Sequence, residues 1–266
     1  MIKAVFFDMD GTLVSYPEGE IPASAVDSLL EMRKKGILIC AATGRCRVEM
    51  DTLGFLQPIP YDAVAVMNGQ YCYTEEQELY LNTLAKEDVA AFMEYQKTEV
   101  VPAIVVEKNR QYVNVETDAF RDALAEIATA LPPVGDMEGV EQRDICQLVP
   151  FCSAETVATL EARMPSSKAV RWSPVFVDII AKKGGKVQGI EAILTHFGLS
   201  WDEVMAFGDG QNDIGMIEKA AIGVAMGNAD EEVKAAADYV TAPAGENGVA
   251  LALRHFGIVD GEETEL

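Results

Sequence analysis

Two short acidic segments, about two hundred residues apart, carry the side chains of this chain that are best suited to chemistry. They are Asp8-Met9-Asp10-Gly11-Thr12 and Gly208-Asp209-Gly210-Gln211-Asn212-Asp213. Carboxylates that converge on one point repel one another unless a cation lies among them. Because neither segment contains His or Cys, the oxygen ligands favour Mg²⁺ over zinc. The first chemistry that these residues suggest is therefore a magnesium site.

Each acidic segment directly follows a run of apolar residues, Ile2 to Phe7 in one case and Val204 to Phe207 in the other. Apolar runs of about four to eight residues that end in Gly-rich turns are typical of buried strands in a parallel sheet, where ligands bind at the carboxyl ends of the strands. Side chains alternate along a strand, so Asp8 and Asp10 are expected on the same side. The sequence therefore predicts that both acidic segments meet at one edge of a sheet.

Further polar residues are expected at the same edge. The apolar strand Ile37 to Ala42 ends in Thr43-Gly44-Arg45, which offers a hydroxyl, a permissive glycine and backbone amides for an anion. Lys186 begins a predicted helix that ends at Phe197, with Gly198 as the stop signal. The dipeptide Asn68-Gly69, after a strand from Ala63 to Met67, is interpreted only as a turn. For Arg45 and Arg47, substrate contact and simple surface exposure both remain open.

The Asp8-x-Asp10-Gly11-Thr12 and Gly208-Asp209-x-x-Asn212-Asp213 motifs, with Thr43 and Lys186 between them, resemble the haloacid dehalogenase (HAD) superfamily, in particular its Cof-type phosphatases. The resemblance covers essentially the whole chain. It implies that Asp8 is the nucleophile that takes the phosphoryl group and that Asp10 is a general acid and then a general base. It also implies phosphate contacts for Thr43 and Lys186, to which we add Gly44 and Asn212 from their positions.

The predicted metal ligands are Asp8, Asp10, Asp209 and Asp213, with Asp10 contributing its backbone carbonyl. Asp213 lies four residues beyond Asp209, so a helix that starts in this turn would let both face one site. There Asp213 could bind metal-bound water or orient Lys186. The chain departs from the family pattern in two places: Val187 stands where Gly is common, and Cys46 stands where Pro is often found. Lys182 and Lys183 are cations that compete with Lys186 for the phosphate role.

The alternation of strands and helices predicts an α/β fold with a Rossmann-like parallel-sheet core and an inserted α+β cap domain. Residues 1–83 and 184–266 are assigned to the core, and residues 84–183 to the cap, which would select the substrate. Further core strands are expected at Ile222 to Met226 and Tyr239 to Thr241, and core helices at Ser24 to Lys35 (capped by Ser24 and Asp27, stopped by Gly36), Asp213 to Ala220, Asp230 to Ala237 and Gly248 to Phe256. The cap is expected to contain a hairpin of Val101 to Glu107 with Gln111 to Glu116, strands at Ile145 to Phe151, Lys168 to Trp172 and Val175 to Ile180, and helices at Lys86 to Gln96, Thr117 to Leu131 and Ser153 to Met164.

Composition restricts the partners. The net charge of −22 and the pI near 4.4 argue against a nucleic-acid groove or an anionic membrane surface, which require clustered Lys and Arg. No segment approaches the length of apolar sequence that spans a membrane, and the N-terminus does not resemble a signal peptide. Five scattered cysteines fit free thiols in a reducing cytoplasm better than a disulfide framework. We expect a cytoplasmic monomer or weak homodimer.

The resemblance implies an Mg²⁺-dependent phosphatase that hydrolyses small phosphorylated metabolites, such as sugar phosphates, through an aspartyl-phosphate intermediate. Flavin and pyridoxal phosphates are other candidate substrates. Asp10 excludes the dehalogenases, phosphonate hydrolases and ion-pumping ATPases of the superfamily, which carry other residues there. A phosphomutase or phosphotransferase stays open because it differs only in what accepts the phosphoryl group. A non-catalytic phosphometabolite-binding protein is a third, less favoured alternative.

Overall fold

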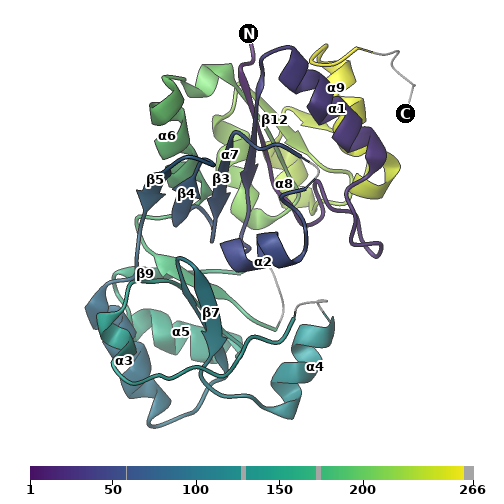
Figure 1. The fold of residues 1–266 in the computed structure, drawn as a ribbon. Helices are drawn as coiled ribbons and strands as arrows, with labels where there is room; N and C mark the ends of the chain where they lie inside the picture. Colours follow the sequence, from purple (N-terminus) through teal and green to yellow (C-terminus); the bar gives the residue numbers. More distant parts are fainter. Residues whose placement is uncertain (58, 127–129, 172–174, 261–266) are drawn as a thin grey trace.

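Two separate β-sheets organise the chain. The computed structural model describes all residues except 58, 127–129, 172–174 and 261–266. An eight-stranded sheet with its helices forms one body, a five-stranded sheet with its helices forms the other, and helix α2 (Arg47–Thr52) lies between them (Figure 1). This arrangement confirms the predicted α/β fold with a core and a cap. The exact domain limits of 1–83, 84–183 and 184–266 stay a proposal.

The larger sheet has the strand order β13-β12-β11-β1-β2-β3-β4-β5. Its pairs are parallel from β13 to β3, and only β4 and β5 are antiparallel. The strands are β1 (Ala4–Phe7), β2 (Leu38–Ala42), β3 (Ala63–Val66), β4 (Tyr71–Tyr73), β5 (Glu78–Leu81), β11 (Val204–Gly208), β12 (Ile222–Ala225) and β13 (Tyr239–Val240). A mainly parallel order places the carboxyl ends of the central strands at one edge.

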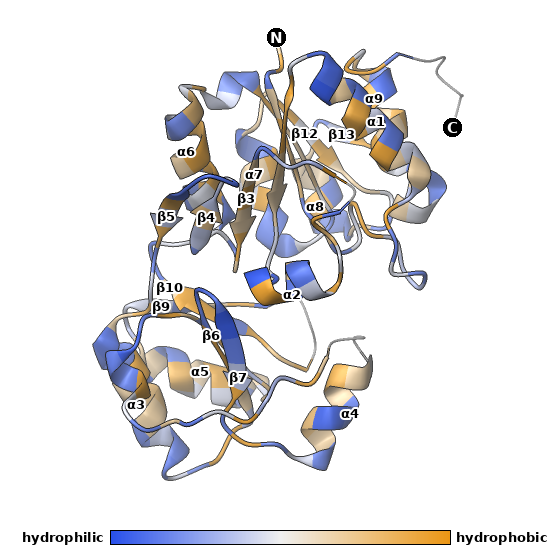
Figure 2. Cartoon of the chain, in the orientation of Figure 1, coloured by the Kyte–Doolittle hydropathy of each residue, from blue (hydrophilic) through white to orange (hydrophobic). Residues whose placement is uncertain are grey.

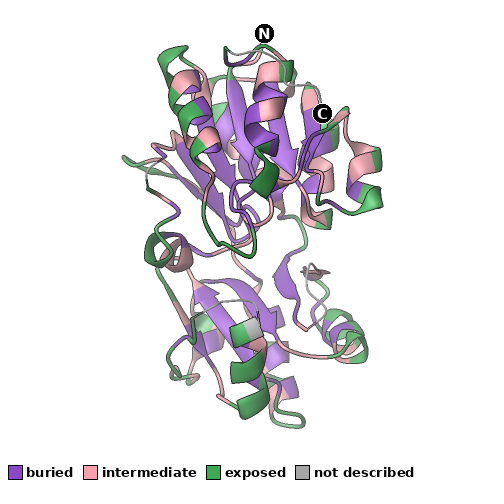
Figure 3. Cartoon of the chain, turned by 90° about the vertical axis from the view of Figure 1, so that its right-hand side faces the viewer, coloured by how far each residue is buried: buried purple, intermediate pink, exposed green. Residues whose placement is uncertain are grey.

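Helices cover both faces of this sheet, so its central strands are apolar at every position. Val5 and Phe7 pack toward α1 (Ala23–Lys34) and α9 (Gly248–His255), whereas Ala4 and Phe6 pack toward α6 (Lys186–Phe197) and α7 (Ile214–Lys219). The remaining core helix is α8 (Glu231–Ala236). Figure 2 shows the apolar colouring along these strands, and Figure 3 shows the same strands buried while the outer faces of the helices are exposed.

The smaller sheet is antiparallel, with the order β7-β6-β8-β10-β9. Its strands are β6 (Ala103–Glu107), β7 (Arg110–Val113), β8 (Ile145–Pro150), β9 (Ser167–Val170) and β10 (Asp178–Ala181). Helices α3 (Lys86–Gln96) and α5 (Ala154–Arg163) pack on one face and share its hydrophobic cluster. Helix α4 (Asp118–Glu126) follows β7. We call this sheet, with α3, α4 and α5, the cap.

Most predicted elements are present, and the differences have local causes. The expected Ser24/Asp27 cap is wrong: α1 begins after Pro22, and Ser24 Oγ instead donates to Asn247 Oδ1 at 2.5 Å. The predicted β7 extension to Glu116 ends at Val113, and the strand predicted from Val175 begins only at Asp178. Parts of the predicted helix Thr117 to Leu131 and strand Lys168 to Trp172 lie outside the described residues. Helix α2 and the β4–β5 pair were not predicted.

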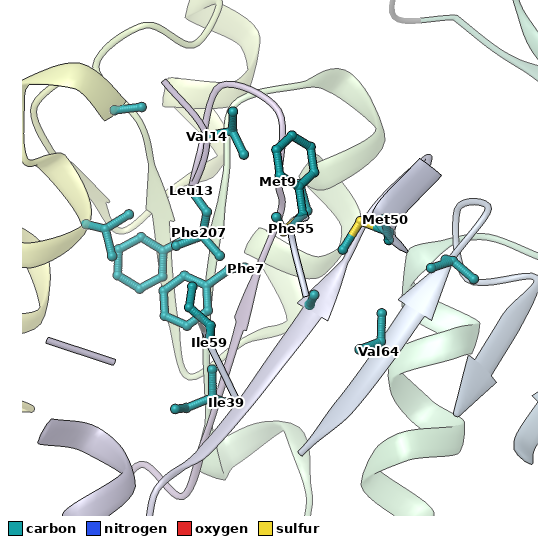
Figure 4. Close-up of a cluster of buried hydrophobic side chains, with 14 of the residues drawn as sticks. Phe7, Met9, Leu13, Val14, Ile39, Met50, Phe55, Ile59, Val64 and Phe207 are labelled. Carbon is teal, nitrogen blue, oxygen red and sulfur yellow. The ribbon is translucent and has the colours of Figure 1, made fainter. Parts of the chain in front are cut away.

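Hydrophobic packing beneath the acidic edge fixes the two acid-bearing strands side by side. Phe7 of β1 is in register with Phe207 of β11, and their rings stack with centroids 5.0 Å apart. Ile39 and Leu13 belong to the same buried cluster (Figure 4). Stacked aromatic pairs add stabilisation beyond the area that they bury. The packing therefore delivers the residues that follow Phe7 and Phe207 to one place.

Candidate active site

The two acidic segments meet at the carboxyl edge of the parallel sheet, which confirms the first prediction from sequence. The Asp8 amide donates to the Phe207 carbonyl at 3.0 Å, so the chain stays paired as it leaves β1. Asp209 follows β11 directly, and Asp213 lies in the turn of 3₁₀ helix that precedes α7. Carboxylate oxygens of Asp8, Asp209 and Asp213 all lie within 4.8 Å of one another.

Lys186 lies at the centre of this group of acids. Its ammonium donates to Asp8 Oδ1 at 2.5 Å and to Asp213 Oδ1 at 2.6 Å, and its side chain is 1% exposed. Lys186 is the first residue of α6. The residue before it, Gly185, has a φ of 143°. Of the three neighbouring lysines considered from sequence, Lys186 is the one that reaches the acids, whereas Lys182 and Lys183 are exposed.

Burial and charge shift the titration of these groups. Burial raises the pKa of Asp8 well above its ordinary value, against the attraction of Lys186. Burial, together with the nearby charge of Asp213, raises the pKa of Asp209 to about 7. Burial alone would lower the pKa of Lys186, but the charges of Asp213 and Asp8 outweigh it and raise that pKa. The acids are therefore short of compensating positive charge.

A divalent cation fits this donor set. Three carboxylates and one ammonium leave two formal negative charges in the group of Asp8, Asp209, Asp213 and Lys186, of which only Asp209 is partly exposed. All three acids offer hard oxygen ligands, which suit Mg²⁺. The Asp10 carboxylate is not part of this group. The predicted contribution of Asp10 was through its backbone carbonyl, and that contribution stays a prediction.

Asp209 is held in place by residues that the sequence reasoning did not assign. Thr12 Oγ1 donates to Asp209 Oδ1 at 3.1 Å, and Asn228 Nδ2 donates to Asp209 Oδ2 at 3.1 Å and to the Gly11 carbonyl at 2.9 Å. Gly11 has a φ of 81°, and a Cβ there would clash with the Asp209 carboxylate. The Gly and Thr of the first motif thus position the acid of the second.

Asp10 is bound by Arg45 rather than by the cluster of acids. Arg45 Nε donates to Asp10 Oδ2 and Arg45 Nη2 to Oδ1, both at 2.7 Å. The Tyr16 hydroxyl also donates to Asp10 Oδ1. Burial and the charge of Asp10 raise the pKa of Tyr16 to about 12, so this hydroxyl keeps its proton. Simple surface exposure is therefore wrong for Arg45, whose side chain is 10% exposed, while its contact with substrate stays a prediction. Arg47 instead stacks over Tyr73.

Thr43 and Gly44 form the turn beside the acids. Thr43 is fully buried, and its Oγ1 accepts a hydrogen bond from the Arg45 amide at 3.1 Å. Gly44 lines the same cavity as Asp8 and Asp10. Both residues are thus where the sequence placed them, while their contact with phosphate stays a proposal.

Asn68 was interpreted as a simple turn residue, but it connects three segments. It has a φ of 53° and is 1% exposed. Its Nδ2 donates to Asp178 Oδ2 of the cap at 2.8 Å, and its Oδ1 accepts from Asn212 Nδ2 at 3.0 Å. The predicted phosphate contact of Asn212 is untested, and its amide is engaged by Asn68 here. The burial and the positive φ of Asn68 are visible only in the structure, and its partners, Asp178 and Asn212, lie far away in the sequence.

A cavity of about 120 Å³ opens onto these residues. Its walls include Asp8, Asp10, Gly44, Arg45 and Asp209, with Gly210, Asn212 and Asp213 completing the set. Larger hollows of about 630 and 1080 Å³ occur elsewhere on the described surface, but no motif acid lines them. Chemistry rather than size therefore identifies the smaller cavity as the candidate active site.

The order of these residues along the chain can be compared with known families. A family model of haloacid dehalogenase-like hydrolases matches residues 5–253. The chain belongs to this family. The match includes both acidic segments, Thr43 and Lys186 of this HAD-like hydrolase.

Individual relatives agree with the family. A Bacillus subtilis (strain 168) protein named "Putative phosphatase YkrA" is 30% identical over 262 residues, which make up 97% of this chain and 98% of that protein. The structure of BT4131, described as a HAD subclass IIB sugar phosphatase, is 38% identical, with a TM-score of 0.87 over 97% of this chain and 100% of its own. BT1666 from Bacteroides thetaiotaomicron, described among HAD phosphatases, is 31% identical, with a TM-score of 0.89 over 97% and 96% of the two chains. This HAD-like hydrolase is therefore an enzyme of the phosphatase group.

Other expectations can also be compared with the structure. All five cysteines lie in the described part of the chain and are free thiols, as predicted. Among the helices described, none combines the length and the apolar character that a membrane crossing requires.

Proposed function

We propose that this enzyme is an Mg²⁺-dependent phosphatase that hydrolyses small phosphorylated metabolites through an aspartyl-phosphate intermediate on Asp8. The observation that carries the proposal is the group of three carboxylates, Asp8, Asp209 and Asp213, whose oxygens lie within 4.8 Å of one another and of which only Asp8 and Asp213 are paired with the Lys186 ammonium. Phosphate monoester hydrolysis is extremely slow without catalysis, and an anionic ester repels an anionic nucleophile. Positive charge and alignment are what such a site must supply.

The residues divide the first step between them. Lys186 holds Asp8 by one carboxylate oxygen, which leaves the other free to attack phosphorus. A bond forms between Asp8 and phosphorus, the ester P–O bond breaks, and the leaving oxygen takes a proton from Asp10. Bound Mg²⁺, held by Asp8 and Asp209, would supply positive charge that screens the approach of the two anions. Thr43 and the backbone at Gly44 would hold the transferred group.

Asp10 acts in the opposite sense in the second step. A water attacks phosphorus, Asp10 takes its proton, and the bond between Asp8 and phosphorus breaks to release inorganic phosphate. Asp10 has already given its proton to the leaving oxygen in the first step, so its carboxylate can take the proton of the water. The first step needs a proton on Asp10, so the contact with Arg45 must loosen as the leaving group arrives. The short reach from Arg45 to Asp10, 2.7 Å at both oxygens, makes Arg45 the residue that orients Asp10.

The substrate class is proposed from the relatives and from the size of the site. BT4131 is described as a sugar phosphatase, and YitU of Bacillus subtilis (strain 168), 24% identical over 263 residues, is named a 5-amino-6-(5-phospho-D-ribitylamino)uracil phosphatase. Both names refer to small phosphate esters. The cavity of about 120 Å³ around Asp8 also suits a phosphate group with a small leaving group.

The proposal is tested by phosphate release from purified protein with a panel of phosphorylated metabolites, with and without Mg²⁺. We expect turnover of small monoesters that requires Mg²⁺ and is abolished in Asp8→Asn, with an unchanged circular dichroism spectrum. An Asp8→Asn variant that keeps most of the parent's activity would overturn the assignment of the nucleophile. Transfer of the phosphoryl group to a sugar hydroxyl in place of water would instead favour a phosphomutase or phosphotransferase.

A further inference from the structure

A small cavity of about 50 Å³ lies between the cap and the acidic edge of the core. It shares Gly44 and Arg45 with the cavity around Asp8, so the two spaces adjoin. The cap contributes six apolar side chains to its wall, Ile104, Val106, Leu124, Val149, Phe151 and Phe176, and three polar ones, Gln111, Gln147 and Asp178. A group bonded to a phosphate on Asp8 and pointing toward the cap would enter this space, which we call the cap pocket.

One face of the cap sheet supplies the wall. Val105 and Leu148 are paired across β6 and β8 and pack into the cluster under α3 and α5. The next pair, Val106 and Gln147, therefore points to the opposite face, because side chains alternate along strands. Both residues line the cap pocket. Gln147 thus places an amide among the apolar side chains of this sheet face, with Gln111 beside Val106 on the neighbouring strand.

The side-chain carbonyl of Gln147 has no hydrogen-bond partner among the described residues. Gln147 is 4% exposed, and its Oε1 is buried. Leaving a buried acceptor unpaired is costly, so such groups are uncommon unless a ligand or water pairs with them. The three charged side chains of the wall are already engaged: Glu49 accepts from the Cys46 amide, Arg45 binds Asp10 and Asp178 accepts from Asn68.

We infer that Gln147 is a specificity-determining residue and that the leaving group of the substrate has an apolar face and a hydrogen-bond donor aimed at Gln147 Oε1. This inference rests on the proposed phosphatase function and narrows its substrate class. The six apolar side chains cannot pair hydroxyls. The amides of Gln111 and Gln147 can pair a few polar groups, so a polyhydroxylated leaving group would leave its further hydroxyls buried without partners, at a cost in free energy. A planar or aliphatic alcohol with one donor avoids that cost.

The test uses phosphate esters of primary alcohols, so that the chemical step is similar in each. The probes are 3- and 4-(hydroxymethyl)benzyl phosphate, the matching ethylbenzyl phosphates, which have the same shape without the donor, and glucose 6-phosphate. We expect kcat/KM for the better (hydroxymethyl)benzyl isomer to exceed that for glucose 6-phosphate. The ratio of hydroxymethyl to ethyl compound measures recognition of the donor.

Gln147→Leu removes the acceptor and keeps the approximate size of the side chain. We expect the hydroxymethyl-to-ethyl ratio of kcat/KM to fall about tenfold, which corresponds to the loss of one buried hydrogen bond. Hydrolysis of the ethyl compound should be unchanged or faster. The thermal unfolding midpoint should be unchanged or higher, because an unpaired buried acceptor is removed. Gln142→Leu is the matched control, since Gln142 is an exposed residue of the cap and should leave the ratio unchanged.

The outcomes separate this inference from the proposed function. If glucose 6-phosphate is the best substrate of the parent, or if Gln147→Leu leaves the ratio unchanged, the inference is overturned while the phosphatase function stands. If no ester is hydrolysed, the proposed function fails, and calorimetric binding of the same intact esters decides the inference. A preference for the hydroxymethyl ester that Gln147→Leu removes then supports it, and equal binding or no binding overturns it.

Discussion

Arg45 holds both carboxylate oxygens of Asp10, with each of its two donor nitrogens 2.7 Å from an oxygen. The side chain of Arg45 is 10% exposed, so this two-point contact is largely shielded from water. Planar, bidentate ion pairs fix the orientation of a carboxylate as well as its charge. Arg45, in the Thr43-Gly44-Arg45 turn, thus fixes the orientation of Asp10, the proposed acid and base.

Replacing Arg45 by Lys tests this positioning role. Lysine keeps the charge but has a single nitrogen and cannot make the two parallel contacts. We expect kcat to fall by roughly tenfold to a hundredfold, as small misplacements of a catalytic group do, with less change in KM. Steady-state kinetics of phosphate release measure both constants. Arg47→Lys is the control, because Arg47 stacks on Tyr73 outside the acid cavity. Equal losses in the two variants would remove the special role of Arg45.

Asp10→Ala separates protonation of the leaving group from attack on phosphorus. General acids contribute typically about 10²–10⁴-fold, and they matter most when the leaving group is a strong base. We expect the rate of leaving-group release from alkyl phosphates in the first step to fall within that range, and the same rate for p-nitrophenyl phosphate, whose leaving group needs little protonation, to fall much less. Steady-state kcat should fall for both esters, because the second step also needs Asp10 as the base. The measurement is a comparison of single-turnover rates for the two ester types. Alkyl esters that react as fast as with the parent would contradict the acid role of Asp10.

Local sequence patterns were sufficient to predict the acid edge. Strands β1 and β11 are uninterrupted apolar runs because both of their faces are covered by helices, so their positions and the acids that follow them could be predicted. Helix α6, from Lys186 to Phe197, was likewise predicted, and its end was indicated by the stop signal Gly198. The acids that follow β1 and β11 could therefore be assigned to one edge of the sheet from sequence alone.

Other contacts depend on tertiary placement and could not be predicted. Asn68 pairs with Asp178, 110 residues away, only because the cap returns to the core at that point. Gln147 is one polar residue in a buried strand, and its significance depends on which face of the cap sheet is turned to the acids. The three-residue strand Tyr71–Tyr73 is too short for its alternation to indicate an antiparallel extension of the sheet.

Lys186→Met tests the balance of charge inside the cluster. Lys186 is 3% exposed, and its ammonium bridges Asp8 and Asp213. Its removal therefore leaves two buried carboxylates without their cation. Breaking a buried ion pair from one side costs about 3–5 kcal/mol. We expect the free energy of unfolding, measured by urea titration in chelator, to fall by about that amount and turnover to be lost. Lys183→Met, at an exposed neighbouring lysine, should change neither. An equally stable Lys186→Met protein would show that the cluster does not need this cation.

Asp209→Asn should be at least as stable as the parent without metal and less stable than the parent with Mg²⁺. Without metal, the substitution relieves repulsion between Asp209 and the buried carboxylates of Asp8 and Asp213, so the thermal unfolding midpoint should stay the same or rise. With Mg²⁺ at about a hundred times its Kd, the parent gains roughly 2.7 kcal/mol by mass action, whereas the variant, lacking a ligand, should gain much less. Thermal scans with chelator and with an Mg²⁺ series measure both effects, and Asp202→Asn at an exposed position is the control. An Mg²⁺-induced shift of equal size in Asp209→Asn and the parent would place the cation elsewhere. Activity of the parent that persists in excess chelator would remove the metal from the mechanism.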